Sequence, residues 1–232
     1  MITVPVRHVA PATPRTRVIS LDFSAKAFVF SAGQAVMLGL HDSLLRKPYS
    51  IASAPWEFQT TGHLQVLAQV DDTGGPDPHL ELAGPGTLLD LDGPFGSFGL
   101  PDETRDGLLF VAGGTGIAPL RSMLIERLSR PVNIPISLVY SARSPEEFAF
   151  RPEPDALRAA GRVDAHFTVT RDQESRWTGR RGRIDASLLR EALPSTKSCC
   201  LICGPPQLVA DTLQLLRTLG VGDHQILTER YG

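Results

Sequence analysis

Glycines, arginines, a thiol and a carboxylate directly follow the apolar segments in the second half of the chain. Leu108–Ala112 runs into the glycine-rich stretch Gly113–Pro119, and later apolar segments are followed by Arg143, Arg171 and Glu229. If these segments are parallel strands, their carboxyl ends meet at one edge of a sheet, where ligands of such sheets bind. The spacing therefore predicts a binding site at that edge, with arginines available for an anionic group.

The glycine-rich stretch is the most informative of these segments. It contains Gly114, Thr115, Gly116 and Pro119, and it lies between an apolar strand and an amphipathic helix. Glycines let a backbone approach a pyrophosphate closely, and the free amides at a helix start favour an anion. No Lys-Ser or Lys-Thr pair follows, so an ATP-type phosphate loop is not indicated. The stretch predicts dinucleotide binding, and a purely structural tight turn is the alternative.

Alternating strands and helices must position this site. The predicted strands are 108–112, 136–140, 163–170, 199–203 and 225–228. Helical segments separate them: one opens at Pro119, Ser144–Glu147 is a capping box, Asp185 can cap Ala186–Leu193, and Pro206–Leu219 is amphipathic. This alternation predicts an α/β unit with a doubly wound, parallel, five-stranded sheet.

The first half of the chain has a different period. Short alternating stretches at 16–23, 34–38 and 64–70 are bounded by Gly, Pro or Asp, and Asp77–Leu82 is the only helix candidate. Closely spaced short strands predict an antiparallel barrel or sandwich. A polar stretch at 101–106 separates the halves, so we expect domains at residues 1–102 and 103–232.

A second candidate site lies at Lys47–Ser53, at the end of a strand in the first half. A cation, an aromatic ring and hydroxyls alternate there along an extended backbone. Such a strand can hold a flat ring beside Tyr49 while Lys47 meets a phosphate. An ordinary strand with one exposed lysine is the alternative.

Composition excludes several classes of function. The chain has 232 residues, 42% of them hydrophobic, and a net charge of -2, which gives no basic surface for nucleic acid. No apolar run approaches the roughly 20 residues that cross a bilayer. The three cysteines lie within 199–203, and the six histidines show no metal-binding spacing. We therefore expect a cytoplasmic protein without disulfides, metal or a membrane partner.

The cysteines do not indicate a dithiol redox switch. Cys200 and Cys203 have the spacing of a dithiol motif, but they lie within a predicted strand. Residues three apart on a strand point to opposite faces.

With these motifs in place, the chain resembles the ferredoxin–NADP reductase superfamily over nearly its whole length. The motifs that carry the resemblance are Lys47-Pro48-Tyr49-Ser50, Gly113–Pro119, Cys203-Gly204-Pro205, Gly33-Gln34, Gly93–Gly96 and Glu229-Arg230-Tyr231. The resemblance implies an antiparallel Greek-key β-barrel that binds FAD, followed by a domain that binds NADP(H) or NAD(H) as the hydride substrate. The chain lacks the four-cysteine set of the family's fused iron–sulfur module.

The resemblance also assigns roles to residues. It implies that Ser50 lies near the flavin N5, that Cys203 and Glu229 lie near the nicotinamide C4, and that Tyr231 stacks on the flavin until nicotinamide displaces it. It places these residues at FAD: Lys47, Pro48, Tyr49, Ser50, Ile51, Leu67, Gln69, Gly74, Gly75, Pro76, Asp77 and Tyr231. It places these at the nicotinamide nucleotide: Gly114, Thr115, Gly116, Pro119, Arg143, Thr170, Arg171, Arg181, Cys203, Gly204 and Pro205.

Two positions depart from the family pattern. Lys47 replaces the usual arginine, with Arg46 one position early, and a lysine lacks the guanidinium fork that grips a pyrophosphate. Gly74–Asp77 falls where the family usually has a Gly and a Ser or Thr near the flavin pyrophosphate. The Asp77 side chain would repel a phosphate, so a phosphate bound there would have to be held by backbone amides.

Three functions follow as hypotheses. The first is an FAD-dependent NAD(P)H oxidoreductase that exchanges electrons with a separate ferredoxin, flavodoxin or oxygenase component. The second is a free-flavin reductase that uses flavin as a substrate. The third is a non-catalytic nucleotide-binding subunit for electron transfer or assembly. Thr170-Arg171 resembles the pair that grips the extra phosphate of NADPH, so we expect a preference for NADPH over NADH.

Overall fold

The computed structural model describes residues 1–70, 78–101, 106–172 and 177–231. Backbone contacts divide the chain into two compact units. The first contains Met1–Leu100 and Arg121–Arg130, and the second contains Pro101–Leu120 and Pro131–Gly232. The predicted domain boundary after residue 102 falls within 102–105, outside the described residues, and stays a prediction. Among the described residues, no helix is both long and apolar enough to cross a membrane.

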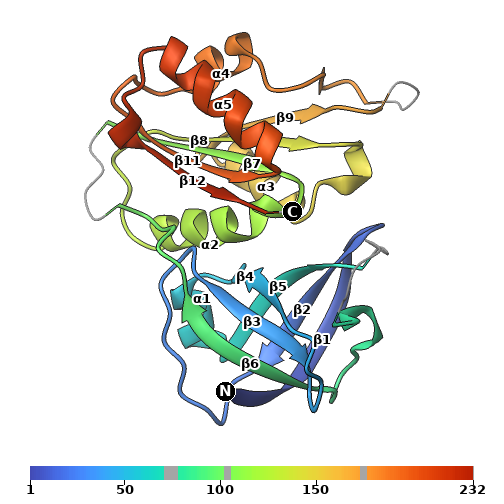
Figure 1. Ribbon diagram of the computed structural model, residues 1–232. Coiled ribbons are helices and arrows are strands. Elements are labelled where there is room, and N and C mark those ends of the chain that lie inside the picture. Colours follow the sequence, from blue (N-terminus) through green and yellow to red (C-terminus); the bar gives the residue numbers. More distant parts are fainter. Residues whose placement is uncertain (71–77, 102–105, 173–176, 232) are drawn as a thin grey trace. The chain divides into compact units, whose positions relative to one another are not determined.

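The first unit is a closed barrel of six antiparallel strands (Figure 1). They are β1 (Ile2–Thr13), β2 (Thr16–Asp22), β3 (Ala35–Leu40), β4 (Lys47–Ser50), β5 (His63–Gln69) and β6 (Leu88–Phe95), in the order β4-β3-β6-β1-β2-β5. The barrel closes directly after β4, where Ile51 pairs with Val66 and the Ala52 amide donates to the Gln65 carbonyl at 2.7 Å. This confirms the predicted antiparallel Greek-key barrel.

Strand alternation explains the core of this barrel. Successive side chains on a strand point to opposite faces. Alternate residues are therefore apolar and buried: Ile19 and Leu21 on β2, and Leu64, Val66 and Ala68 on β5. Phe58, from the short helix α1 (Pro55–Thr61), packs against the same cluster.

The predicted strands of the first half correspond to β2, β3 and β5, but three elements were missed. The strands β1 and β6 contain prolines, and a sequence with prolines does not indicate a strand because proline cannot donate a backbone hydrogen bond. Pro5 ends the ladder with β6 and Pro11 lies beside a register shift, positions where a strand can lack an amide donor. The helix α1 opens on Pro55, which suits a first turn.

The only helix predicted in this half was wrong in extent. Of Asp77–Leu82, only Leu80–Leu82 forms a single 3₁₀ turn, and Asp77 lies outside the described residues.

The second unit contains the five predicted parallel strands. They are β7 (Leu108–Gly113), β8 (Ile136–Ala142), β9 (Asp164–Val169), β11 (Cys199–Gly204) and β12 (Ile226–Arg230). A two-residue strand, β10 (Arg180–Arg181), adds a sixth at the edge, so the predicted count was one too low. The order is β10-β9-β8-β7-β11-β12.

Helices connect these strands. They are α2 (Ile117–Leu128), α3 (Pro152–Ala159), α4 (Ala186–Ala192) and α5 (Pro206–Thr218). The helices α4 and α5 lie together on one face of the sheet (Figure 1), where Leu188 and Leu216 join a cluster with Val111 and Ile202. These parallel strands and their helices are the doubly wound arrangement expected from the alternation.

Two predicted helix starts had different outcomes. The Asp185 carboxylate accepts a hydrogen bond from the Leu188 amide at 2.8 Å, as the predicted cap of α4 requires. Ser144 does not cap a helix, because its hydroxyl donates to the Glu146 carboxylate at 2.7 Å and only a 3₁₀ turn follows. The next helix, α3, begins at Pro152.

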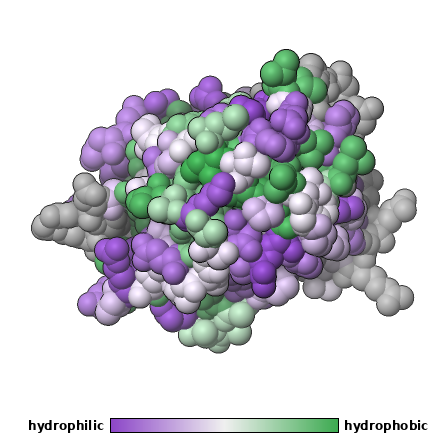
Figure 2. Space-filling model, turned by 90° about the horizontal axis from the view of Figure 1, so that it is seen from below, coloured by the Kyte–Doolittle hydropathy of each residue, from purple (hydrophilic) through white to green (hydrophobic). Residues whose placement is uncertain are grey.

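The exposed apolar side chains are mostly scattered. Among the described residues, Val29, Leu44 and Leu82 are the most exposed large apolar ones beyond the first residue of the chain. Figure 2 shows one face of the molecule, on which apolar side chains are interspersed with polar ones. Isolated exposed leucines are ordinary on protein surfaces and need no functional explanation.

Candidate functional site

The glycine-rich turn after β7 lies very close to the end of β11 in the second unit. The turn Gly114–Gly116 follows β7, and α2 begins directly after it. A Cβ atom on Gly116 would lie 2.3 Å from the Cys203 carbonyl oxygen, and Gly114 has a φ of +55°. Only glycine fits such a contact without a shift of the backbone. The turn therefore lies against the end of β11, as the predicted convergence at this edge requires.

Cys203 and Glu229 are neighbours at the same edge. The register of β11 and β12 pairs them, and the Cys203 Sγ donates to Glu229 Oε2 at 3.7 Å. Burial, reinforced by the nearby carboxylate, raises the pKa of the Cys203 thiol well above its usual range. A thiol that stays protonated is a hydrogen-bond donor and not a nucleophile. The pair can thus orient a ligand without any covalent step.

Tyr231 lies across the glycine-rich turn. Its hydroxyl donates to the Gly113 carbonyl, and its amide donates to the Gly204 carbonyl at 3.3 Å. Burial raises the pKa of this hydroxyl, so it remains a donor. The chain's terminal aromatic residue therefore sits at the same edge as the predicted nucleotide-binding residues. Its predicted stacking on a flavin stays a prediction.

Tyr140 is a residue of this site that the sequence analysis missed. It lies in β8, is fully buried, and its hydroxyl donates to the Gly114 carbonyl at 3.0 Å. The same hydroxyl accepts from the Ala149 amide at 3.1 Å, and burial raises its pKa. A tyrosine within a fully buried strand needs hydrogen-bond partners for its hydroxyl. The position of Tyr140 in such a strand could have indicated its role. Tyr140 thus holds the backbone of the glycine-rich turn in place through its hydrogen bond to Gly114.

We expect Tyr140→Phe to loosen the glycine-rich turn. The change leaves the Gly114 carbonyl and the Ala149 amide without their buried partner, which costs about 1–3 kcal/mol of stability. The KM for a nicotinamide nucleotide should rise several-fold, while flavin affinity stays unchanged. Thermal unfolding and steady-state kinetics measure both effects, and a wild-type KM would remove Tyr140 from the site.

Two arginines come together where β8 and β9 end. The Arg171 amide donates to the Arg143 carbonyl at 2.9 Å, and the Thr170 amide donates to Ala142 at 3.0 Å. Both arginines are exposed residues, and neither forms an ion pair with any residue that the structure describes. Two cations on adjacent strand ends can bind a phosphate.

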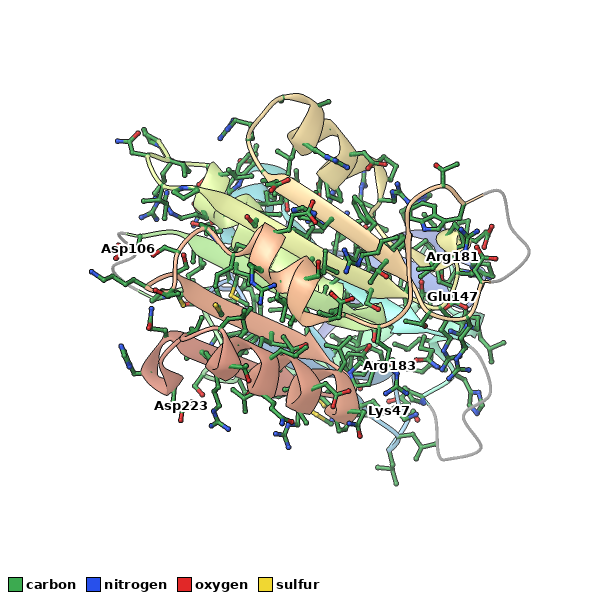
Figure 3. The ribbon with its side chains drawn as sticks, turned by 90° about the horizontal axis from the view of Figure 1, so that it is seen from above. Lys47, Asp106, Glu147, Arg181, Arg183 and Asp223 are labelled. Carbon is green, nitrogen blue, oxygen red and sulfur yellow. The ribbon has the colours of Figure 1, made fainter. Side chains whose placement is uncertain are left out.

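Arg181 is less available than the sequence suggested. Its Nε donates to the Asp172 carbonyl at 3.1 Å, and its guanidinium lies 3.9 Å from the Asp172 carboxylate. Figure 3 shows Arg181 and Arg183 at the opposite end of the sheet from Asp106 and Asp223, which precede β7 and β12. Arg181 is therefore at the predicted edge, but its charge already has an acidic neighbour.

The predicted flavin residues of the first unit lie on β4 and β5. Lys47, Tyr49 and Ser50 are half-buried, Pro48 and Gln69 are exposed, and Ile51 and Leu67 are buried. The Tyr49 ring packs against the barrel core. The Ile51–Val66 pair is inside the barrel, so Ser50 and Leu67 lie next to each other on its outer face. The predicted residues Gly74, Gly75, Pro76 and Asp77 lie outside the described residues.

Arg46, one residue before β4, already has acidic partners. The Arg46 guanidinium is held by Asp92 at 3.1 Å and by the buried Asp90 at 3.3 Å. It is therefore engaged within the barrel.

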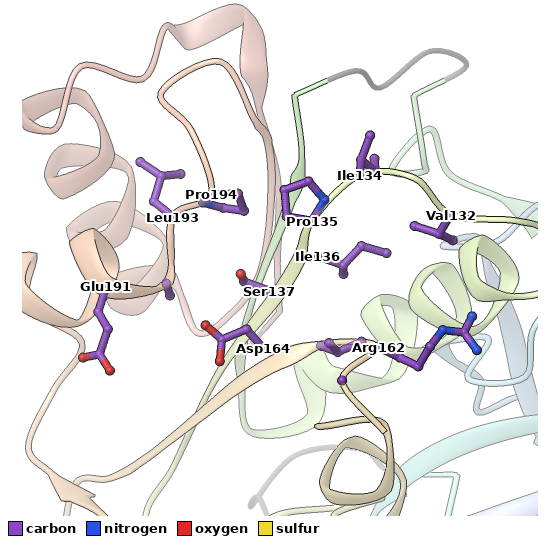
Figure 4. Close-up of a pocket in the computed structure, with 13 residues that line it drawn as sticks. Val132, Ile134, Pro135, Ile136, Ser137, Arg162, Asp164, Glu191, Leu193 and Pro194 are labelled. Carbon is purple, nitrogen blue, oxygen red and sulfur yellow. The ribbon is translucent and has the colours of Figure 1, made fainter. Parts of the chain in front are cut away.

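A cavity of about 390 Å³ lies elsewhere in the second unit (Figure 4). Its walls include Ile136, Ser137, Asp164, Glu191 and Pro194. Since β8 begins at Ile136 and β9 at Asp164, the cavity is at the amino ends of the strands. None of the predicted site residues that the structure describes lines it, so it is separate from the candidate site.

Comparisons with known proteins agree with this geometry. The family model of the oxidoreductase NAD-binding domain matches residues 110–214. Ferredoxin–NADP reductase B of Sorangium cellulosum is 33% identical over 96% of this chain and 94% of its own length. One component of the Na(+)-translocating NADH-quinone reductase of Psychrobacter arcticus is 35% identical over 64% of this chain, and the match spans only 38% of that component.

Solved structures have the same fold. The ferredoxin NADP+ reductase from Neisseria gonorrhoeae, solved with bound FAD and NADP, aligns with a TM-score of 0.80 at 25% identity, over 99% of this chain and 98% of that one. The ferredoxin reductase in carbazole 1,9a-dioxygenase aligns with a TM-score of 0.86 at 22% identity, over 100% of this chain and 69% of that one. Because the Sorangium cellulosum relative exceeds 30% identity over nearly all of both chains, this chain belongs to the ferredoxin–NADP reductase superfamily of FAD- and NAD(P)-dependent oxidoreductases.

Proposed function

We propose that this protein is an FAD-dependent NAD(P)H oxidoreductase that exchanges electrons with a separate protein, of the ferredoxin or flavodoxin type or an oxygenase component. The observation that carries the proposal is the Cys203–Glu229 pair beside the glycine-rich turn, at the carboxyl edge of the parallel sheet. The similarity to a reductase of Sorangium cellulosum over nearly the whole of both chains supports it.

The residues present fit both groups. The glycine-rich turn packs closely on β11 at Gly116 and leads directly into α2, and the free amides at such a helix start favour an anion such as a pyrophosphate. On β4 a lysine, a half-buried tyrosine and a serine offer a cation, an aromatic face and a hydroxyl, with no carboxylate on that strand. When bound, a flavin accepts a hydride and can release single electrons.

The chain's own groups would orient the exchange. The Ser50 hydroxyl would donate to the flavin nitrogen, and the Cys203 thiol and the Glu229 carboxylate would hold the nicotinamide. Glu229 is half-buried, so it can pass a proton between the site and solvent. Hydride transfer needs contact and alignment more than chemical assistance, so orientation is the main task of these residues.

A free-flavin reductase is the second candidate function. Lys47 lacks the fork of an arginine, and Arg46 is committed to Asp90 and Asp92, which favours a weaker hold on the flavin phosphates. The kinetics of NADPH oxidation with added FAD separates the two functions. A resident flavin predicts activity with a one-electron protein acceptor and no dependence on free FAD. Activity that saturates with free FAD would support the alternative.

The two arginines at the strand ends support a preference for NADPH. Arg143 and Arg171 lie side by side there, where the extra phosphate of NADPH would bring up to two negative charges. We expect Arg171→Ala to lower the NADPH-to-NADH ratio of kcat/KM by about tenfold or more, the usual effect of losing a charged hydrogen bond. Arg190→Ala, an exposed arginine on α4, is the matched control. A wild-type ratio in Arg171→Ala would contradict the assignment.

A further inference from the structure

Arg121 is a buried arginine that forms hydrogen bonds with Glu57 and with the backbone of Ala52 in the first unit. It lies on α2 and is only 8% exposed. Its two terminal nitrogens donate to the two carboxylate oxygens of Glu57, each at 3.0 Å. One of them also donates to the Ala52 carbonyl at 2.8 Å. The pair is thus bidentate, the geometry that fixes both position and angle.

A short segment directly after β4 is held by Glu57, the partner of Arg121, and by the adjacent residue Ser122. Glu57 accepts from the Ala54 amide at 2.8 Å, and the Ser122 hydroxyl donates to the Ser53 carbonyl at 2.8 Å. On the other side, the Ala52 amide donates to β5 at 2.7 Å. Ala52, Ser53 and Ala54 are all buried. Each residue of the segment is therefore held by at least one hydrogen bond of its backbone.

This segment begins two residues after Ser50. A buried ion pair is costly to desolvate and is often replaceable by apolar residues without loss of stability. Apolar residues cannot, however, form the directional hydrogen bonds by which Arg121 and Glu57 hold the Ala52 carbonyl and the Ala54 amide. An arginine and a glutamate at these positions therefore point to a role in placing the segment.

We propose that Arg121 and Glu57 are positioning residues that hold Ala52–Ala54 and thereby set the orientation of the Ser50 hydroxyl on β4. The proposal rests on the proposed flavin site, but the position of the segment can be measured without flavin. It assigns no contact between these two residues and the flavin.

The test compares an apolar double variant, Arg121→Met with Glu57→Met, with the wild type. We expect a folded protein whose unfolding temperature falls by a few degrees, because the apolar pair fills the space but leaves the Ala52 carbonyl and the Ala54 amide without these partners. Hydrogen exchange of the 52–54 amides in the flavin-free protein should accelerate by about tenfold or more, while β1 amides are unchanged. The Kd for FAD should rise about tenfold as the strand end loosens.

Two further variants make the result specific. Arg121→Lys keeps the charge and one hydrogen bond, so its exchange rates and FAD Kd should fall between those of wild type and double variant. Arg130→Met, an exposed arginine just beyond α2, should match the wild type. Wild-type exchange at 52–54 in a folded double variant would overturn the proposal. If the wild type itself binds no FAD, the proposed function fails, and the exchange data still decide the positioning role.

Discussion

Gly116→Ala should weaken binding of NADPH by about 100-fold, the loss that a misplacement of about 1 Å at a site can cause. The added Cβ would lie 2.3 Å from the Cys203 carbonyl oxygen and 2.9 Å from the Gly204 nitrogen. Neither atom belongs to a flexible side chain, so the turn must move away from β11. Movement of the turn would disturb both the amides that face the pyrophosphate and the Cys203–Glu229 pair.

The matched control is Gly84→Ala. No atom of the described residues lies within 4 Å of a Cβ built on Gly84, so this change should leave nucleotide binding intact. Equilibrium titration with NADPH measures the affinity, and FAD binding in the first unit reports whether the Gly116 variant is folded. A Gly116→Ala protein that binds FAD and NADPH like the wild type would contradict the proposed nucleotide site.

Ser50→Ala should slow flavin reduction by about 100-fold, the typical contribution of one positioned hydroxyl or proton donor in a transition state. The KM for NADPH should change little, since the hydroxyl is proposed to act on the flavin. Ser50 faces outward from the barrel and is half-buried, so removing its oxygen leaves the core cluster untouched. Stability should therefore be close to that of the wild type.

Stopped-flow absorbance of the flavin measures this rate. Ser187→Ala, at a serine of α4 in the second unit, provides a comparison with no proposed role. If Ser50→Ala reduces its flavin at the rate of the wild type, the serine has no part in hydride transfer.

Much of the second unit was predictable because its strands are apolar on both faces. Leu108–Ala112 and Cys199–Cys203 stand out as short apolar runs, and parallel strands bring the residues after their carboxyl ends to one edge. The convergence of the glycine-rich turn with Cys203 could thus be inferred. The family resemblance placed Cys203 and Glu229 in the same site, but their pairing in register could not be inferred from the residues, because strand register depends on contacts far apart in the chain.

The first unit was harder to predict. Prolines in β1 and β6 hid two strands, since a proline is compatible with a strand only where no amide donor is needed. The side chains of Arg121 and Tyr140 bond to backbone carbonyls of residues 69 and 26 positions away. No local pattern of residue types reveals such partners, so these supporting residues emerged only from the fold.

The measurement that tests the central claim most directly is the absorbance spectrum of the purified protein after desalting, before and after anaerobic NADPH. The proposed function predicts a yellow protein that retains FAD close to one per chain and loses its flavin absorbance when NADPH is added. Colourless protein that leaves added FAD oxidised in the presence of NADPH would contradict it.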